Sequence, residues 1–413
     1  MLIIIGSSGY PSIVSGQEQD ICPGFTAEDQ SDIYHEVDFG ESIQFHLCWH
    51  NSPEIEEAEI SVFVEGFDAP IEGFVQAPAG AGEGDLINLN HTINLGQAVI
   101  SPFREIEYTW HLTYKNQSSE TLQALSFEYI DNRVEWQQKE SGDKTIRVFS
   151  DPANELEADL AIEILENARE DIGGIIPSEL RSANEPIIVY LYPNTDLFLS
   201  ALRLTGLNFV AGQASPELGV MMIPLGDPAA TEVDLAQRLP HELVHLMIFQ
   251  ATGTQYENFP AWLDEGLATR FETYTNLSYA ATMETVTDAT QLISFAELCT
   301  NLPLQPPEMV LRGYAQSNML TNYLIAQHEV KAVQNIIRAV AAGEVCDQAV
   351  ESSIGITSDA LAGEWLEKQQ PVFPDPGAPE WLPIIVIVVF FAIIMIVIWA
   401  RTDNMRTIGD YNR

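Results

Sequence analysis

The sequence predicts a multidomain chain: an all-β domain, then an α+β domain, then one C-terminal transmembrane helix. The chain has 413 residues, which is enough for two folded domains. Apolar and polar residues alternate between residues 21 and 140, and buried-strand and helical patterns follow from 144 to 370. An uncharged apolar run then occupies 382–399.

Alternation with a period of two marks the strands of the first domain, 21–140. Ile43, Phe45, Leu47 and Trp49 alternate with polar residues, and 60–64 and 106–114 repeat the pattern. Stretches rich in Gly, Pro and Asn separate these runs, as in an antiparallel sandwich of the immunoglobulin-like kind. Such a module binds or positions more often than it catalyses, so it could hold a surface partner.

The second domain, 144–370, mixes strands and helices. Strands are expected at 144–149, 186–192 and 219–224, with a helix at 154–171. Helical spacing then follows in 263–275, 315–327, 331–342 and 357–369. This order predicts a small mixed sheet with helices packed against it.

Two short motifs carry the chemistry of the second domain. HELVH at 241–245 places His241 and His245 on one face of a helix, with Glu242 beside them. WLDEGLA at 262–268 follows, and Glu265 supplies the third ligand that catalytic zinc needs. The motifs predict one Zn²⁺ held by His241, His245 and Glu265, with Glu242 as general base.

Pro240 stands directly before the first histidine. Proline is tolerated in the first turn of a helix but removes a hydrogen bond from a helix interior. We therefore expect the active-site helix to begin at Pro240, with 234–239 as a separate or kinked turn.

These two motifs resemble the gluzincin branch of zinc metallopeptidases. More narrowly, residues 145–370 resemble the peptidase MA-like domains of bacterial surface proteins, including YAQS at 314–317 and a helical tail ending near Trp365. The resemblance implies a zincin-like fold and peptide-bond hydrolysis by a zinc-activated water. A Gly-x-Met-Glu-Asn segment, which gluzincin aminopeptidases use, is missing upstream. Its absence favours an endopeptidase.

Further residues receive roles around this site. By its position in the resembling domain, Tyr314 is the expected stabiliser of the oxyanion, although a core tyrosine fits its position as well. Asp264 and Thr269 are expected to hydrogen-bond the histidines, and Asp264 could equally cap a helix. By the resemblance, an edge strand binds substrate backbone, and it is assigned to Gly219, Val220, Met221, Met222 and Ile223. The alternative for these five residues is an ordinary core strand.

The chain carries 60 acidic and 18 basic residues, for a net charge of −42. A chain this acidic repels nucleic acid, which we exclude as a partner. A peptide or protein is the expected substrate. The alternative to an enzyme is a non-catalytic surface binding or adhesion protein, whose peptidase-like scaffold holds zinc structurally. The intact Glu242 argues against that alternative.

The apolar run predicts a single-pass anchor at 381–400, long enough to cross the ~30 Å core of a lipid bilayer. Acidic residues precede it and arginines follow it. This asymmetry orients the tail, 401–413, to the cytoplasm and the catalytic domain outside the cell. Residues 371–380 form a Pro-rich stalk, and 1–20 resemble a clipped export signal.

Four cysteines fall two to each domain, Cys22 and Cys48, then Cys299 and Cys346. Outside the cytoplasm, two intradomain disulfides are favoured over four reduced thiols.

Overall fold

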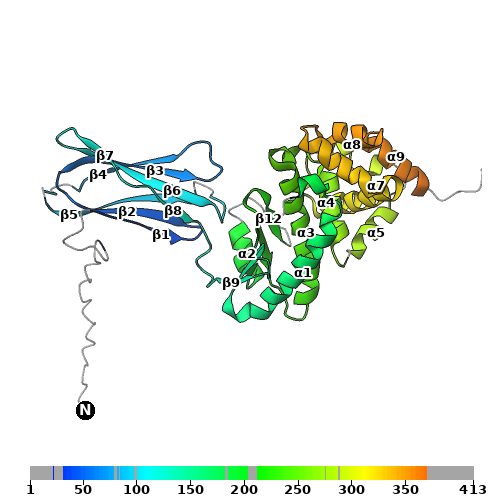
Figure 1. Ribbon diagram of the computed structural model, residues 1–413, viewed down its shortest axis with the longest axis horizontal. Helices are drawn as coiled ribbons and strands as arrows, with labels where there is room; N and C mark the ends of the chain where they lie inside the picture. The colour runs from blue at the N-terminus through cyan, green and yellow to red at the C-terminus, as the bar shows by residue number, and fades with distance from the viewer. Residues whose placement is uncertain are drawn as a thin grey trace, which may run out of the picture.

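The computed structural model describes residues 22, 31–78, 81–82, 84–96, 100–181, 185–202, 212–274, 276–286 and 289–369. The expected signal segment 1–20, stalk 371–380, membrane span 381–400 and tail 401–413 lie outside the described residues. Among the helices that are described, none is long and apolar enough to cross a membrane. A β-sandwich and a helix-covered sheet make up the described part of the chain (Figure 1).

Two antiparallel sheets form the sandwich. One has the order β1-β2-β5, with β1 at Ser31–Asp38, β2 at Ser42–His50 and β5 at Leu86–Asn94. The other has the order β4-β3-β6-β7, and β8 also pairs with β6. Its strands are β3 (Ile55–Val64), β4 (Ile71–Gln76), β6 (Glu105–Tyr114), β7 (Ser119–Thr121) and β8 (Leu125–Glu128).

The alternating residues of the sequence form the core between these sheets. Ile43, Phe45 and Leu47 of β2 are fully buried, as are Ile60 and Trp110 of the facing sheet. Side chains of a strand alternate between its two faces, so a period of two in the sequence becomes one apolar face. The predicted sheet-rich region is thereby confirmed.

A third sheet, which belongs to the second domain, begins before the predicted domain boundary. Its order is β12-β13-β11-β10-β9. The strands are β9 (Gln137–Glu140), β10 (Ile146–Ser150), β11 (Ile187–Tyr192), β12 (Gln213–Ser215) and β13 (Val220–Pro224). The central three are parallel, and both edge strands are antiparallel. Residues 137–140, expected in the first domain, therefore pair with this third sheet.

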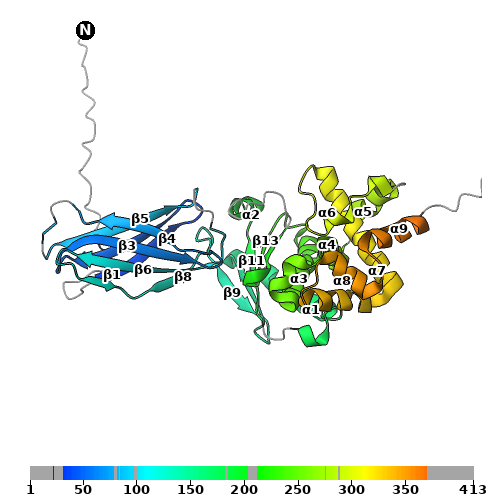
Figure 2. The same cartoon turned by 90° about the horizontal axis from the view of Figure 1, so that it is seen from above.

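Helices cover one face of this sheet and continue beyond it (Figures 1 and 2). They are α1 (Glu155–Gly173), α3 (Thr231–Thr252), α4 (Ala261–Phe271), α5 (Leu277–Glu284), α6 (Phe295–Leu298), α7 (Pro307–Ala341), α8 (Cys346–Ile354) and α9 (Ser358–Gln369). Helix α2 (Thr195–Leu202) instead packs on the other face, where it buries Phe198, Ala201 and Leu202 in the core shared with the sandwich. Helices α1 and α3 bury Leu165 and Leu243 against Val148, Val189 and Met221 of the strands. A non-helical residue, Glu329, divides α7 where the sequence predicts a break.

Aromatic residues join the sandwich to the opposite face of the sheet. Phe103 stacks on Tyr190 with ring centroids 4.0 Å apart, and Trp136 meets Tyr190 and Tyr192 edge-on. Arg104 adds an ion pair of 3.1 Å to Glu217. The sandwich and α2 therefore lie on one side of this sheet, and α1 and α3 lie on the other (Figure 2).

Candidate metal centre

Helix α3 carries both histidines of the predicted zinc motif. It runs through Thr231–Thr252, with the buried Pro240 in its interior. The expectation that the helix begins at Pro240 is therefore wrong. The carbonyl of Ala236, which a proline at 240 deprives of its helical partner, accepts a hydrogen bond from the Thr273 backbone instead.

Three side chains converge between α3 and α4. Nε2 of His241 lies 3.4 Å from Oε2 of Glu265, and Nε2 of His245 lies 3.8 Å from the same oxygen. One ligand atom from each residue falls within 4.8 Å of the others. The Glu265 oxygen is buried and has no hydrogen-bond partner. A buried carboxylate oxygen without a donor requires a compensating cation, so the donor set fits zinc.

The outer nitrogen of each imidazole is held by a carboxylate. Nδ1 of His245 donates to Oδ2 of Asp264 at 3.0 Å. Nδ1 of His241 donates to Oε1 of Glu272 at 3.0 Å. With Nδ1 as the donor, each Nε2 keeps its lone pair for a metal.

These two carboxylates are themselves fixed by neighbours. The hydroxyl of Tyr256, in the 3₁₀ turn Gly253–Asn258, donates to Asp264 at 2.6 Å. Gln237 of α3 donates through Nε2 to Oε2 of Glu272 at 3.1 Å. Each histidine therefore ends a chain of hydrogen bonds that sets its ring orientation.

Asp264 lies where the sequence places it, but Thr269 does not contact a histidine. Thr269 donates to the Gly266 carbonyl and accepts from Asn318 of α7, because its side chain lies on the α7 side of α4. Glu272, which sequence reasoning missed, follows Glu265 by two helical turns and shares its face. An acidic residue at a helix C-terminus opposes the helix dipole, and that misfit is the signal for Glu272.

The carboxylates also raise the proton affinity of the histidines. Burial lowers the pKa of His241, but the neighbouring carboxylates of Glu265 and Glu272 raise it further, to well above its ordinary value. Burial also opposes the charged form of His245, whereas Asp264 and Glu265 raise its pKa to about 9. Without metal, protons therefore occupy the positions that a cation would take.

Glu242 lies beside the edge of the sheet. Its side chain is buried, and burial raises the pKa of its carboxyl group against the lowering effect of both histidines. The backbone of Ala214 in β12 donates a hydrogen bond to it. Gly212 leaves room for it, since a Cβ there would lie 2.8 Å from Oε1 of Glu242.

The strand assigned to substrate binding is not at an edge. Val220, Met221, Met222 and Ile223 lie in β13, which pairs with β11 on one side and β12 on the other. Gly219 precedes the strand with a positive φ of 67°. Both sides of β13 are already paired, so the core-strand alternative holds. The edge strand is β12, which is too short for a visible sequence period.

Tyr314 lies on α7 close to the ligands. Its ring centroid is 6.4 Å from that of His241. The charge of Glu265, together with burial, raises the pKa of the Tyr314 hydroxyl, which stays protonated at neutral pH. Gly266 permits this approach of α7, because a Cβ there would lie 2.0 Å from Oγ1 of Thr321.

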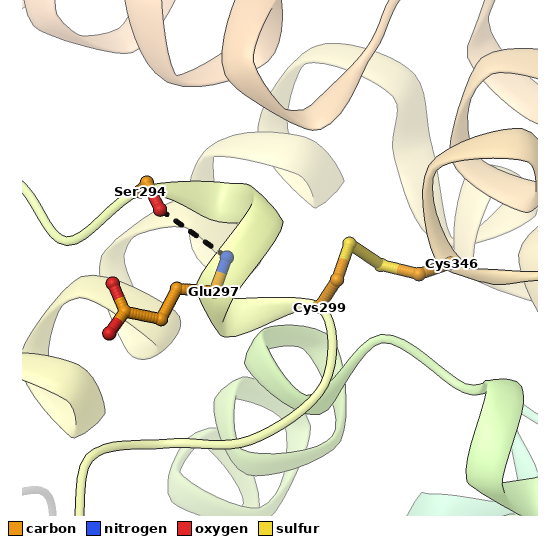
Figure 3. The surroundings of a disulfide bond; sticks show 4 residues. All are labelled: Ser294, Glu297, Cys299 and Cys346. Carbon is orange, nitrogen blue, oxygen red and sulfur yellow. Dashed lines mark hydrogen bonds between the residues drawn. A yellow bond between two sulfur atoms is a disulfide. The ribbon is translucent and has the colours of Figure 1, made fainter.

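A disulfide supports the start of α4. Cys299 is bonded to Cys346 at the start of α8, next to the short helix that Ser294 caps by accepting from the Glu297 backbone (Figure 3). The Cys299 carbonyl accepts from the Ala261 backbone at 3.2 Å. The second disulfide joins Cys22 to Cys48 in the sandwich, so both bridges join the pairs favoured by the sequence.

Comparisons with known proteins support a peptidase scaffold. Residues 178–369 match the family model described as the Peptidase MA superfamily. The search of curated proteins finds no match.

Solved structures align only loosely with this chain. A polysaccharide deacetylase from Bacillus cereus aligns at 7% identity over 48% of this chain and 60% of its own, with a TM-score of 0.19. A purple acid phosphatase from yellow lupin (Lupinus luteus) seeds aligns at 8% identity over 48% of this chain and 34% of its own, also with a TM-score of 0.19. The chain thus spans less than two thirds of either structure, and scores this low support no conclusion.

The matched segment contains both zinc motifs and all the helices from α3 to α9. As the two motifs indicated, residues 178–369 of this chain are similar to the Peptidase MA superfamily.

Proposed function

We propose that this protein is a membrane-anchored, extracytoplasmic zinc metallopeptidase that hydrolyses peptide bonds within a polypeptide. One observation carries the proposal: two imidazole nitrogens and an unpartnered carboxylate oxygen converge beside a buried glutamate. A helical pair of histidines with an adjacent glutamate is the arrangement expected for metal-assisted hydrolysis.

His241, His245 and Glu265 would hold the zinc ion with one position left open. Zinc bound there supplies the Lewis acidity that makes water nucleophilic near neutral pH. Glu242 accepts the proton from the attacking water and returns it to the leaving amine. Burial raises the pKa of Glu242 toward the working pH, which suits a group that must both take and release a proton.

The residues around Glu242 suggest how a peptide is held. Strand β12 is an antiparallel edge strand, and its Ala214 backbone contacts the Glu242 carboxylate. A substrate that pairs with this edge by strand addition would bring its backbone to the general base. Tyr314, whose hydroxyl is protonated and whose ring lies near that of His241, would donate to the developing oxyanion.

The endopeptidase and the membrane parts of the proposal rest on the sequence. The aminopeptidase segment Gly-x-Met-Glu-Asn is missing, and the apolar run 382–399 lies between an acidic flank and an arginine-containing tail. Protease added outside intact cells should therefore remove the catalytic domain and leave residues 401–413 protected.

The decisive test compares the full chain with its Glu242→Gln variant, which keeps the shape but loses the base. We would measure zinc content and cleavage of a denatured protein and a mixed-peptide library. Both proteins should hold about one zinc, and only the wild type should cleave, by a margin of about 10²–10⁴. If both proteins bind zinc and cleave equally, or if neither cleaves, the result would instead support the non-catalytic scaffold.

A further inference from the structure

The proposed reaction leaves one unusual residue of α3 without a role. Pro240 lies in the helix interior, buried and directly before His241. A proline has no amide hydrogen, and its ring crowds the carbonyl four residues earlier. The Ala236 carbonyl is therefore without its usual helical donor.

That carbonyl is used by another segment. The Thr273 backbone, just beyond α4, donates to Ala236 at 3.3 Å. In a regular helix, this carbonyl would accept a hydrogen bond from the backbone amide of residue 240 in the same helix. The missing bond of α3 therefore becomes a contact between α3 and the end of α4.

The same contact brings a carboxylate to the first histidine. Glu272, next to Thr273, accepts from Nδ1 of His241 at 3.0 Å and from Gln237 at 3.1 Å. Ala236 and Gln237, which are consecutive in α3, thus hydrogen-bond to Thr273 and Glu272, which directly follow α4. The Glu272 side chain is only 4% exposed, so this clamp fixes it away from water.

His245, the other histidine, does not depend on such a contact between α3 and the end of α4. Asp264, its partner, lies in the first turn of α4 and is fixed by the Tyr256 hydroxyl. Glu272 instead lies at the C-cap of α4, with a non-helical ψ of 126°. Asp264 is thus carried by a regular turn of α4, whereas Glu272 lies beyond the last residue of α4 and is held by contacts with α3.

We propose that Pro240 is a positioning residue of the zinc site, because it frees the carbonyl that docks Thr273 and so holds Glu272 against His241. The inference rests on the proposed zinc site. Partners that orient a ligating histidine are worth about 10–100-fold in metal affinity. A helix without the proline would close its own hydrogen bond and release the 272–273 segment.

The test uses Pro240→Ala in the full chain, with Pro307→Ala as matched control. Pro307 begins α7, where a proline frees no interior carbonyl. In Pro240→Ala the zinc dissociation constant should rise by about tenfold. In the metal-free protein, the peptide containing Thr273 should exchange its amide hydrogen at least about tenfold faster, because that hydrogen bond is lost. The control should change neither quantity.

A double-mutant cycle separates positioning from a general effect on the helix. Pro240→Ala should weaken zinc binding in the wild type but not in Glu272→Ala, where there is no carboxylate left to place. The metal-free Pro240→Ala protein should melt at the same or a higher temperature, because alanine favours a helix interior. Weaker zinc binding in a helix of equal or greater stability is not expected from a merely structural role.

Three results would overturn the inference: unchanged zinc affinity in Pro240→Ala, unchanged exchange at Thr273, or an equal loss in the Glu272→Ala background. If the wild type itself takes up no zinc, the proposed function fails. The exchange measurement on the metal-free protein then decides the docking role of Pro240 alone.

Discussion

The two hydrophobic cores of the molecule treat buried charge differently. In the core that runs from the sandwich to the sheet, the buried Asp131 is paired with Arg133 at 2.6 Å. Around α3 and α4, the carboxylates of Glu242, Asp264, Glu265 and Glu272 surround only two histidines. Buried charge is costly unless it is compensated. The first core is therefore built for stability, whereas the second retains negative charge that a cation can balance.

The largest expected effect comes from removing the unpartnered carboxylate of the second core. Glu265→Ala should weaken zinc binding by at least about 10³-fold, beyond the 10–100-fold loss from an outer partner. The pKa of both histidines in the metal-free protein should also fall, because Glu265 helps to raise it. Competition with a chromophoric chelator measures the zinc affinity. Glu257→Ala, which alters an exposed glutamate nearby, is the control and should bind zinc normally.

The opposite pattern is expected in the first core. Phe45 is fully buried between the sheets, next to Tyr108. Phe45→Ala should lower the free energy of unfolding by about 3–5 kcal/mol, because it leaves a cavity. Zinc affinity under native conditions should not change. Denaturant titration and chelator competition on the same sample check both statements, and a joint loss would show that the two cores are not separable.

A smaller effect is expected where the general base meets the edge of the sheet. In Gly212→Ala the new Cβ would lie 2.8 Å from Oε1 of Glu242 and 2.9 Å from Cδ1 of Ile223. The displaced carboxylate should slow peptide cleavage by about 10²-fold, with little change in zinc affinity. Gly363→Ala is the matched control, since a Cβ there meets nothing within 4 Å. If both variants cleaved peptides at equal rates, the result would contradict the role of Glu242 as general base.

The smallest expected effect is the number of protons released when zinc binds. The pKa of His241 is raised well above its usual value, and that of His245 is raised to about 9. Both imidazoles are therefore protonated at pH 7 without metal, whereas zinc takes the neutral form. Binding should release about two protons at pH 7, fewer as the pH rises through about 9, and apparent affinity should rise with pH. Calorimetry in buffers of different ionisation enthalpy measures this count, and a count near zero would contradict it.

The sequence predicts those parts of the fold that depend on local pattern. Phe45 and its neighbours alternate with period two, and the strand expected at 186–192 is β11, at Ile187–Tyr192. The His241 and His245 spacing likewise needs only one helix to bring the two rings together. Even the break in α7 at Glu329 lies between two segments with separate helical spacing.

Features set by distant partners could not be predicted in this way. Glu272 hydrogen-bonds to His241 of another helix, and no pattern in the sequence around Glu272 identifies His241 as its partner. The expectation that the helix begins at Pro240 failed because the local rule for proline takes no account of distant residues. Here the backbone amide of Thr273 donates to the Ala236 carbonyl that the proline leaves free. Strand β12 spans three residues, too few to show a period, so the edge was assigned to the strongly apolar β13.

Zinc bound between α3 and α4 should be held by two imidazoles and one carboxylate. The X-ray absorption spectrum at the zinc edge, recorded on the full chain with one equivalent of zinc, measures this ligand set. We expect two imidazole nitrogens at about 2.0–2.1 Å, one carboxylate oxygen, and no sulfur. A spectrum with sulfur ligands, or with fewer than two imidazoles, would contradict it.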